Sequence, residues 1–387
     1  MIGHKIVPSR RGGIELVITT LAPGLVRSGD EVVCYNRKGS PTEEEYLNRI
    51  KDSTFEGVQL REAWSIKGRG IQAAVASFTA AIQATFSGFD VLHFHALGPC
   101  AAMWIPKLFG RKCVATVHGL DWKREKWKNG WGAKYIKLGE RIMVRCADEI
   151  IVLSEGVQRY YQETYGRETV NIPNGVLRAD NVPADRIMEK FGLEKDGYFL
   201  LLSRLVEEKG VHFLIDAYQQ MKTDKKLVIA GDVSDTVDYV RQIKQMAEGN
   251  PNILFTGFVS GRMLEELYSN AYAYVLPSTV EGMPLSLLEA LSYGNAVICS
   301  DIPENTDVIG DCGVSFRCAD VDDLRSKLQF FIDQPRVVYD LKARAADYIC
   351  SKYRWEDVTA QTREVYRRAI GKRQQAGKPP AHPELDT

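Results

Sequence analysis

Short apolar runs rich in β-branched residues alternate with longer helical stretches along almost the whole chain. This alternation predicts parallel sheets whose strands are joined by helical crossovers. Strands are expected in the first half at 31–36, 90–95, 113–118, 149–154 and 169–172, and in the second half at 198–203, 226–230, 252–256, 273–276 and 296–300. Because 387 residues suffice for two α/β domains that each bury a core, we expect two Rossmann-like, doubly wound domains.

Turn signals and a short charged helix at 174–197 predict a link between a first domain at 1–173 and a second at 198–350. The tail at 371–387 is rich in Gly, Pro and Lys, and we expect it to be disordered. A doubly wound domain requires a strand before its first glycine-rich turn, but only Met1-Ile2 precede a polar stretch there. Either that strand is a stub, or the true start lies upstream.

The composition argues against several classes of protein. Lys plus Arg and Asp plus Glu number 50 each, so no overall field attracts nucleic acid. No apolar run approaches the roughly 20 residues of a membrane-spanning helix, and the N-terminus lacks a signal-peptide core. The eight cysteines are scattered without a CxxC pair, which predicts free thiols in a reducing cytosol and no metal site.

A pair of cations lies where an apolar strand in the second half leads into an amphipathic helix. Arg204 is at the strand end and Lys209 is near the helix start. Ligands bind at the carboxyl ends of strands in open α/β sheets, and helix N-termini favour phosphate. Two cations there suit a diphosphate and would offset the charge that grows on a departing nucleoside diphosphate. The competing interpretation is a solvated loop in which Lys209 pairs with Glu207 or Glu208.

Two glutamates, Glu281 and Glu289, follow the apolar strand expected at 273–276. Proline is favoured in the first turn of a helix, so we expect a helix to open near Pro284, with Glu281 in the loop. On one continuous helix the two carboxylates would lie about 12 Å and 80° apart, unlike the about 5–9 Å of paired catalytic carboxylates. Gly282 would let backbone N–H groups approach a ligand, while the glutamates accept from sugar and ribose hydroxyls. The alternative makes Glu289 an ordinary exposed helix residue.

These two motifs together resemble glycosyltransferase family 4, of the GT-B fold, over nearly the whole chain. The resemblance implies two Rossmann-like domains facing across a cleft, with Arg204 and Lys209 on the diphosphate of a nucleotide-sugar donor and Glu289 on its ribose. The closing helix at 353–370 resembles the element that crosses back to pack on the first domain. The other donor-binding positions implied are Glu281, Gly282, Met283, Pro284 and Leu285 at the transferred sugar, and Val259, in Phe258-Val259, at the base.

The first half contributes further residues by the same resemblance. Gly12-Gly13 resembles the family's first loop, near the donor phosphates, and His118 resembles a histidine held near the transferred sugar. An imidazole there can bond hydroxyls or help proton movement, although a histidine at a strand end is often structural. His93 and His95 share one face of a strand, and we expect one of them to point into the cleft. The acceptor-side candidates are His95, Asp121 and Trp122.

A literal DxD, Asp320-Val321-Asp322, opens a late helix and is interpreted as an N-cap, so neither a metal nor a cofactor is expected. The stretch Lys107–Arg145 contains eleven Lys or Arg against three acids, with four tryptophans in or beside it. Such a stretch suits an anionic membrane surface or a lipid-diphosphate acceptor. The competing interpretation is a solvated helix face.

The run 119–127 resembles bacterial polysaccharide transferases, including rhamnosyltransferases that act on polyprenyl-linked acceptors. We therefore expect a retaining, metal-independent transferase in the cytoplasm, peripheral at the inner face of the membrane, that moves a hexose or deoxyhexose such as rhamnose. Its expected acceptor is a glycan or a polyprenyl-linked precursor of cell-surface polysaccharide. The alternatives are a nucleotide-sugar epimerase of the same fold and a non-catalytic nucleotide-sugar-binding partner. A nicotinamide dehydrogenase is disfavoured because the early glycines form GG and not G-x-G-x-x-G.

Overall fold

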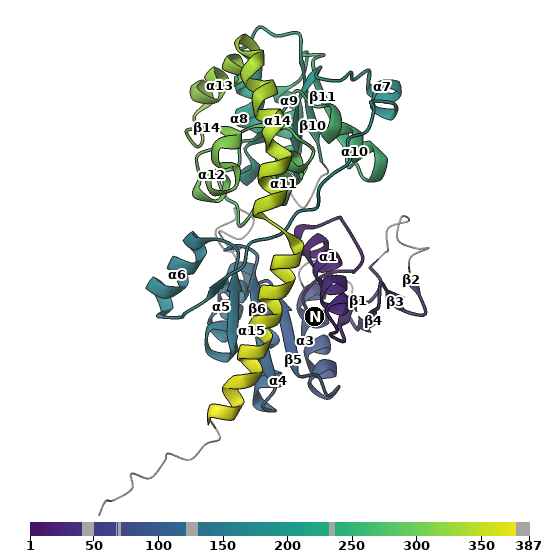
Figure 1. Ribbon diagram of the computed structural model, residues 1–387, viewed down its shortest axis with the longest axis vertical. Helices are drawn as coiled ribbons and strands as arrows, with labels where there is room; N and C mark the ends of the chain where they lie inside the picture. Colours follow the sequence, from purple (N-terminus) through teal and green to yellow (C-terminus); the bar gives the residue numbers. More distant parts are fainter. Residues whose placement is uncertain (41–49, 67, 69–70, 121–130, 232–236, 377–387) are drawn as a thin grey trace, which may run out of the picture. The chain divides into compact units, whose positions relative to one another are not determined.

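The structure is a computed structural model that describes residues 1–40, 50–66, 68, 71–120, 131–231 and 237–376. The chain separates into two compact units. The first unit contains described residues between Met1 and Ile172 together with those from Val358 onward, and the second runs from Pro173 to Asp357. Each unit carries helices on a predominantly parallel β-structure (Figure 1).

The strands of the first unit form two four-stranded sheets. One has the order β1 (Val33–Arg37), β4 (Val58–Ala63), β3 (Thr54–Phe55), β2 (Ile50–Lys51). The other is parallel and has the order β5 (Val91–His95), β6 (Lys112–Val117), β7 (Glu149–Val152), β8 (Val170–Asn171).

The first two residues of the chain lie between these sheets. Ile2 forms a parallel bridge with Phe94, and its N–H donates to the His93 carbonyl at 2.9 Å. On the other side, the Tyr35 N–H donates to the Met1 carbonyl at 3.1 Å. A two-residue segment therefore occupies the place of the strand expected before Gly12-Gly13.

Local sequence signals explain where the helices of the first unit begin and end. The Ser154 hydroxyl accepts from the Val157 N–H at 3.3 Å and caps the start of α6, while Gly166 ends that helix at φ 60°. The helical elements of this unit are α1 (Gly13–Arg27), α3 (Ile71–Thr85), η1 (Pro99–Ala102), α4 (Trp104–Leu108), α5 (Trp131–Cys146) and α6 (Glu155–Tyr165).

The closing helix α15 (Trp355–Ala376) is bound to the first unit through polar contacts. Arg363 donates to both carboxylate oxygens of Asp30, at 2.8 and 3.2 Å, and the Tyr366 hydroxyl lies 2.7 Å from His93 Nδ1. Because α15 continues to Ala376, the expectation of disorder from residue 371 was wrong for its first six residues. Residues 377–387 lie outside the described part of the chain.

The second unit has one six-stranded parallel sheet. Its order is β11 (Ile253–Gly257), β10 (Lys226–Ala230), β9 (Tyr198–Leu202), β12 (Ala273–Leu276), β13 (Ala296–Ser300), β14 (Gly313–Phe316). This is the 3-2-1-4-5-6 order of a doubly wound nucleotide-binding fold, in which the direction of winding reverses between the first and fourth strands. Here the reversal lies between β9 and β12.

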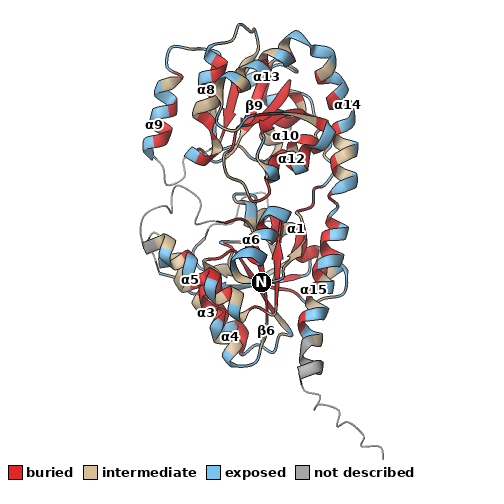
Figure 2. Ribbon diagram, turned by 90° about the vertical axis from the view of Figure 1, so that its left-hand side faces the viewer, coloured by how far each residue is buried: buried red, intermediate tan, exposed pale blue. Residues whose placement is uncertain are grey.

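Helices cover this sheet, and their buried faces complete an apolar core with the strands (Figure 2). The helical elements are α7 (Arg186–Phe191), η4 (Glu207–Lys209), α8 (Val211–Gln219), α9 (Val237–Met246), α10 (Gly261–Asn270), α11 (Leu285–Ser292), α12 (Pro303–Ile309), η5 (Gly310–Cys312), α13 (Val321–Asp333) and α14 (Pro335–Lys352). The short α7 lies in the expected link, and the Ile187 N–H at its start donates to the buried Glu266 carboxylate at 3.0 Å. That link belongs to the second unit.

All ten strands expected from the sequence are present, with ends within two residues of the expected ones. The bounds of β10, β12 and β13 are as expected. The sequence analysis missed β4 and β14, and also the two-residue strands β2 and β3. All eight cysteines are free thiols, as expected. None of the helices in the described ranges has the length and apolarity that crossing a membrane requires.

Candidate active site

The donor-side candidates of the second unit gather at the carboxyl ends of its two central strands. Arg204 comes two residues after the end of β9, and Glu281 comes five residues after the end of β12. Because β9 and β12 flank the reversal of strand order, both loops open where doubly wound sheets bind their ligands. The sequence placed these residues at strand ends, and the strand order makes those ends neighbours.

An ion pair links the two loops. The Lys209 ammonium donates to Glu281 Oε1 at 2.5 Å, and the two side chains are only 14% and 8% exposed. The competing interpretation of the sequence, in which Lys209 pairs with Glu207 or Glu208, is therefore not what the structure shows. A partly buried ion pair loses much of its hydration, so an anionic ligand that shares the ammonium would meet a preplaced, poorly solvated charge.

The backbone around this pair leaves little room. Gly210 adopts φ +66°, and a Cβ there would lie 2.1 Å from the Pro277 carbonyl oxygen. The Thr279 N–H donates to the Glu208 carbonyl at 2.9 Å, which also joins the loop after β9 to the loop after β12. Glycine is thus required at position 210 both by its backbone angle and by the close approach of the second loop.

Helix α11 begins where the sequence predicts, with Pro284 as its N-cap. Glu281 consequently lies in the loop, and Glu289 is on the helix. Gly282, Met283 and Pro284 are buried and Leu285 is half-buried, so the approach to this helix start is lined by apolar side chains and backbone. Met283 Sδ accepts a hydrogen bond from the Asn174 N–H at 3.0 Å.

Two buried tyrosines hold this arrangement, and the sequence analysis missed both. The Tyr274 hydroxyl lies on β12 and contacts the Leu202 carbonyl at 3.0 Å and the Ser286 hydroxyl at 2.9 Å. Burial raises the pKa of Tyr274, so the hydroxyl stays protonated. The Tyr268 hydroxyl donates to Glu289 Oε2 at 3.5 Å. For Tyr274, the sequence signal was a hydroxyl-bearing side chain inside the otherwise apolar strand β12.

Other donor-side candidates lie after the central strand β9 and after the edge strand β11. Arg204 is exposed, and Phe258-Val259 follow the edge strand β11, with Phe258 44% exposed. Gly231, after β10, approaches the Ser203 carbonyl so closely that a Cβ would lie 1.8 Å from its oxygen. The backbone is therefore tightly packed where Gly231 meets Ser203, whereas the side chains of Arg204 and Phe258 are exposed.

In the first unit, Gly12 and Gly13 form the start of α1. A Cβ on Gly12 would lie 2.1 Å from Glu15 Oε2, and Glu15 also accepts the Lys5 N–H at 2.8 Å. The glycine pair thus lets the first loop fold tightly over the opening turn of the helix. Backbone N–H groups at a helix start favour an anion, and in α1 the acidic Glu15 already lies in the first turn.

The histidines of the first unit form a cluster at the ends of β5 and β6. His93 Nε2 lies 2.8 Å from the Thr116 hydroxyl, and His95 Nδ1 lies 3.1 Å from His118 Nε2. His93 and His95 are 2% and 0% exposed, so both rings are buried. His118 is half-buried, and the acceptor-side candidates Asp121 and Trp122 lie outside the described residues.

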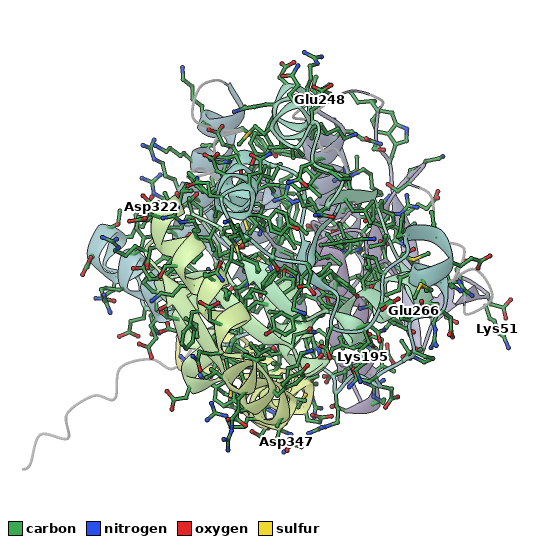
Figure 3. All side chains as sticks on the ribbon, turned by 90° about the horizontal axis from the view of Figure 1, so that it is seen from above. Lys51, Lys195, Glu248, Glu266, Asp322 and Asp347 are labelled. Carbon is green, nitrogen blue, oxygen red and sulfur yellow. The ribbon has the colours of Figure 1, made fainter. Side chains whose placement is uncertain are left out.

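The DxD motif has the structural role that was predicted. Asp320 is the N-cap of α13, and its side chain accepts from the Asp323 N–H at 2.9 Å. Asp322 is 80% exposed at the outside of the unit and pairs with Arg325 (Figure 3). No group of three or more His, Cys, Asp or Glu side chains with metal-binding placement occurs within the described ranges.

Each half of the chain matches the model of a known protein family. A model described as Glycosyltransferase Family 4 matches residues 11–177, and one described as Glycosyl transferases group 1 matches residues 183–349. The chain is a glycosyltransferase with a family 4 domain followed by a group 1 domain. This glycosyltransferase is 26% identical over 220 residues to the O-antigen chain mannosyltransferase B of Escherichia coli, a match that spans 50% of this chain and 57% of that relative.

Solved structures show that the glycosyltransferase has the GT-B fold. Sucrose-phosphate synthase from Thermosynechococcus elongatus superimposes with a TM-score of 0.78 and 19% identity, covering 96% of each chain. The Anabaena protein HepE, solved in complex with UDP and glucose, gives 0.76 and 17% identity over 93% of this chain and 97% of that one. At these identities the likeness establishes the fold alone.

Proposed function

We propose that this glycosyltransferase is a retaining, metal-independent enzyme that takes its sugar from a nucleotide diphosphate donor. The observation that carries the proposal is the grouping of Arg204, Lys209 and Glu281 at the reversal of strand order in the second unit. HepE, a protein of the same fold, was solved with UDP and glucose, which supports a nucleotide sugar as the donor here.

In the proposed reaction, the bond between the anomeric carbon and the diphosphate oxygen breaks with its electron pair leaving on the diphosphate. Arg204, Lys209 and the helix N-termini at this edge offset that growing charge. The acceptor hydroxyl attacks the face that the diphosphate leaves, so configuration is kept, and its proton passes to the released diphosphate. Glu281 holds the transferred sugar, Glu289 the ribose, and the backbone at Val259 the base.

Two experiments test this proposal. In a thermal-shift screen against UDP-, dTDP- and GDP-sugars, the sugars of one nucleotide should raise the melting temperature of the protein. A ligand that binds only the folded state stabilises that state by mass action. The anomeric configuration of the product, read by NMR with EDTA present, should match that of the donor. Inversion, or activity that is lost with EDTA and restored by a divalent cation, would contradict the mechanism.

The rivals give different outcomes in the same experiments. An epimerase would convert the donor to its epimer without an acceptor. A non-catalytic partner would bind the donor and neither hydrolyse nor transfer it. The acceptor we propose is a glycan or a polyprenyl-linked sugar of cell-surface polysaccharide, which the name of the E. coli relative supports.

We also propose that the enzyme works in the cytoplasm, peripheral at an anionic membrane. Along α5, the exposed residues fall on one helical stripe that contains no acid: Lys134, Lys137, Leu138, Arg141 and Arg145. The adjoining α4 exposes Trp104 and Leu108, which are 44% and 74% exposed. Cations beside apolar side chains suit anionic headgroups above a lipid core.

Vesicle co-sedimentation tests the membrane surface. Binding should rise with the fraction of phosphatidylglycerol in phosphatidylcholine vesicles and should fall when Arg141 and Arg145 are changed to Glu. The matched control changes Arg241 and Lys244, two exposed cations of α9, to Glu. Equal loss in both variants would contradict a specific surface on α5.

A further inference from the structure

The histidine that faces His118 is fully enclosed in the first unit. His95 is the last residue of β5, is 0% exposed, and pairs in register with Thr116 of β6. The His93 ring lies on the same face of β5, with its centroid 4.1 Å from that of His95. His118 follows the end of β6, so neighbouring parallel strands bring the two rings together.

The contact between the rings joins one nitrogen of each. His95 Nδ1 lies 3.1 Å from His118 Nε2, and the ring planes are stacked at 30° with centroids 5.4 Å apart. Of two neutral imidazoles in such a contact, one must supply the proton and the other a lone pair. The position of the proton on His118 therefore depends on which ring donates.

The other nitrogen of His95 decides the direction. His95 Nε2 is buried and has no hydrogen-bond partner among the residues that the structure describes. If His118 were the donor, the proton of His95 would have to lie on this Nε2, as a buried N–H with no acceptor. If His95 donates from Nδ1, Nε2 carries only a lone pair, which is the more tolerable buried group.

Charge does not reverse this argument. Burial lowers the pKa of His95 well below the ordinary value of 6.5, and the positive forms of its neighbours His93 and His118 act in the same direction. His95 is accordingly neutral near pH 7, with a single N–H to place.

We propose that His95 is a positioning residue, which donates from Nδ1 to His118 Nε2 and so fixes the proton of His118 on its Nδ1. The catalytic meaning of this step rests on the proposed function, in which His118 serves the transferred sugar. A histidine fixed in this way presents an N–H at Nδ1 and cannot act as a base through Nε2. It would orient a sugar hydroxyl as a donor, and the acceptor proton would go elsewhere, to the departing diphosphate.

Histidine NMR tests the tautomer without any substrate. In 15N-labelled protein, the long-range ring correlations distinguish an Nδ1–H from an Nε2–H imidazole, and His118→Gln identifies the His118 signal among the six histidines. We expect Nδ1–H for His118 in the wild type. An Nε2–H signal there overturns the proposal, whether or not the protein transfers sugar.

Two substitutions separate hydrogen bonding from packing. His95→Asn keeps an N–H donor near the place of Nδ1, whereas His95→Leu fills the site without a donor. We expect the 15N shift of the unprotonated His118 Nε2 to stay near its wild-type value in His95→Asn and to move downfield in His95→Leu, because a lone pair that faces Leu has lost its hydrogen bond. His93→Gln is the matched control, because His93 is buried on the same strand but bonds Thr116 and Tyr366 instead. An unchanged 15N shift of His118 Nε2 in folded His95→Leu overturns the proposal.

Kinetics provide the second readout. His95→Leu should lower kcat about tenfold with little change in the donor KM, since one oriented hydrogen bond is lost in the transition state. His95→Asn should recover most of that loss. Equal loss in the two variants would show that bulk and not donation matters, which overturns the positioning role. If the wild type transfers no sugar, the proposed function fails while the NMR result still stands.

Discussion

Both units place candidate residues at the carboxyl ends of neighbouring parallel strands, but these groups are charged in the second unit and neutral in the first. In the second unit, charged groups at the ends of β9 and β12 meet in the Lys209–Glu281 ion pair. In the first unit, the last part of β5 carries two rings that burial keeps neutral, His93 and His95. The ends of parallel strands can therefore present either charge or oriented neutral hydrogen bonds.

The difference follows from what surrounds each cluster. Lys209 and Glu281 form an ion pair, and their mutual attraction offsets part of the cost of removing two charges from water. No acid lies among the charged neighbours that shift the pKa of His95, and without a counter-charge a desolvated imidazole stays neutral. We infer that the second unit supplies charge for the departing diphosphate and the first supplies orientation.

The largest expected effect removes the charge of the second unit. Arg204→Ala or Lys209→Ala should lower kcat/KM for transfer at least about a hundredfold, because charge stabilisation of the leaving group is lost. Arg241→Ala, which removes an exposed cation on α9 of the same unit, is the control and should retain activity. Near-normal turnover in purified Arg204→Ala or Lys209→Ala would show that these charges of the second unit do not stabilise the leaving group.

The next prediction concerns the backbone that holds the charged loops together. Gly210→Ala should destabilise the protein by about 2 kcal/mol more than Gly192→Ala, through overpacking. Both glycines have nearly the same backbone angle, φ +66° and +60°, so their conformational strain should be similar. Only Gly210 faces backbone at 2.1 Å, whereas Gly192 meets the end of the Lys226 side chain at 3.8 Å. Urea unfolding of both variants measures the difference, and equal losses would refute the steric argument.

Acid should weaken the first unit through its neutral histidines. Burial lowers the pKa of His93 well below 6.5, so below pH 6.5 the unfolded chain binds a proton that the folded protein does not. The stabilisation that neutral His93 provides at neutral pH is therefore lost as the pH falls, at about 1.4 kcal/mol per pH unit. Unfolding free energies at pH 6.5 and 5.5 should fall less steeply for His93→Gln. Parallel slopes would show that His93 titrates normally in the folded protein.

The smallest expected effect concerns the ribose contact. Glu289→Gln keeps the shape and an acceptor oxygen but loses the charge, so donor KM should rise about fivefold, the difference between a charged and a neutral hydrogen bond. Glu248→Gln, on the exposed surface after α9, is the control (Figure 3). An unchanged KM in Glu289→Gln would favour the interpretation of Glu289 as an ordinary helix residue.

Much of the fold could be predicted from the sequence because its central strands are continuous apolar runs. The strands β10, β12 and β13 are buried almost throughout, and turn residues bound them, so their limits can be read directly. The strand β4 escaped prediction because its residues Val58–Ala63 are half exposed and largely polar. The strand β14 begins with a glycine and is only four residues long, too short for a periodic signal.

What the sequence determined by itself was the local chemistry: cations after one strand, glutamates around a helix start, and histidines alternating on another strand. Only the tertiary structure decided which of these meet, because strand order and ring contacts depend on packing between distant segments. Lys209 pairs with Glu281, which is 72 positions away in the sequence, and His95 contacts His118, which is 23 positions away. Whether a buried group meets an opposite charge, as Lys209 does and His95 does not, is likewise a property of the assembled core and not of the residues in it.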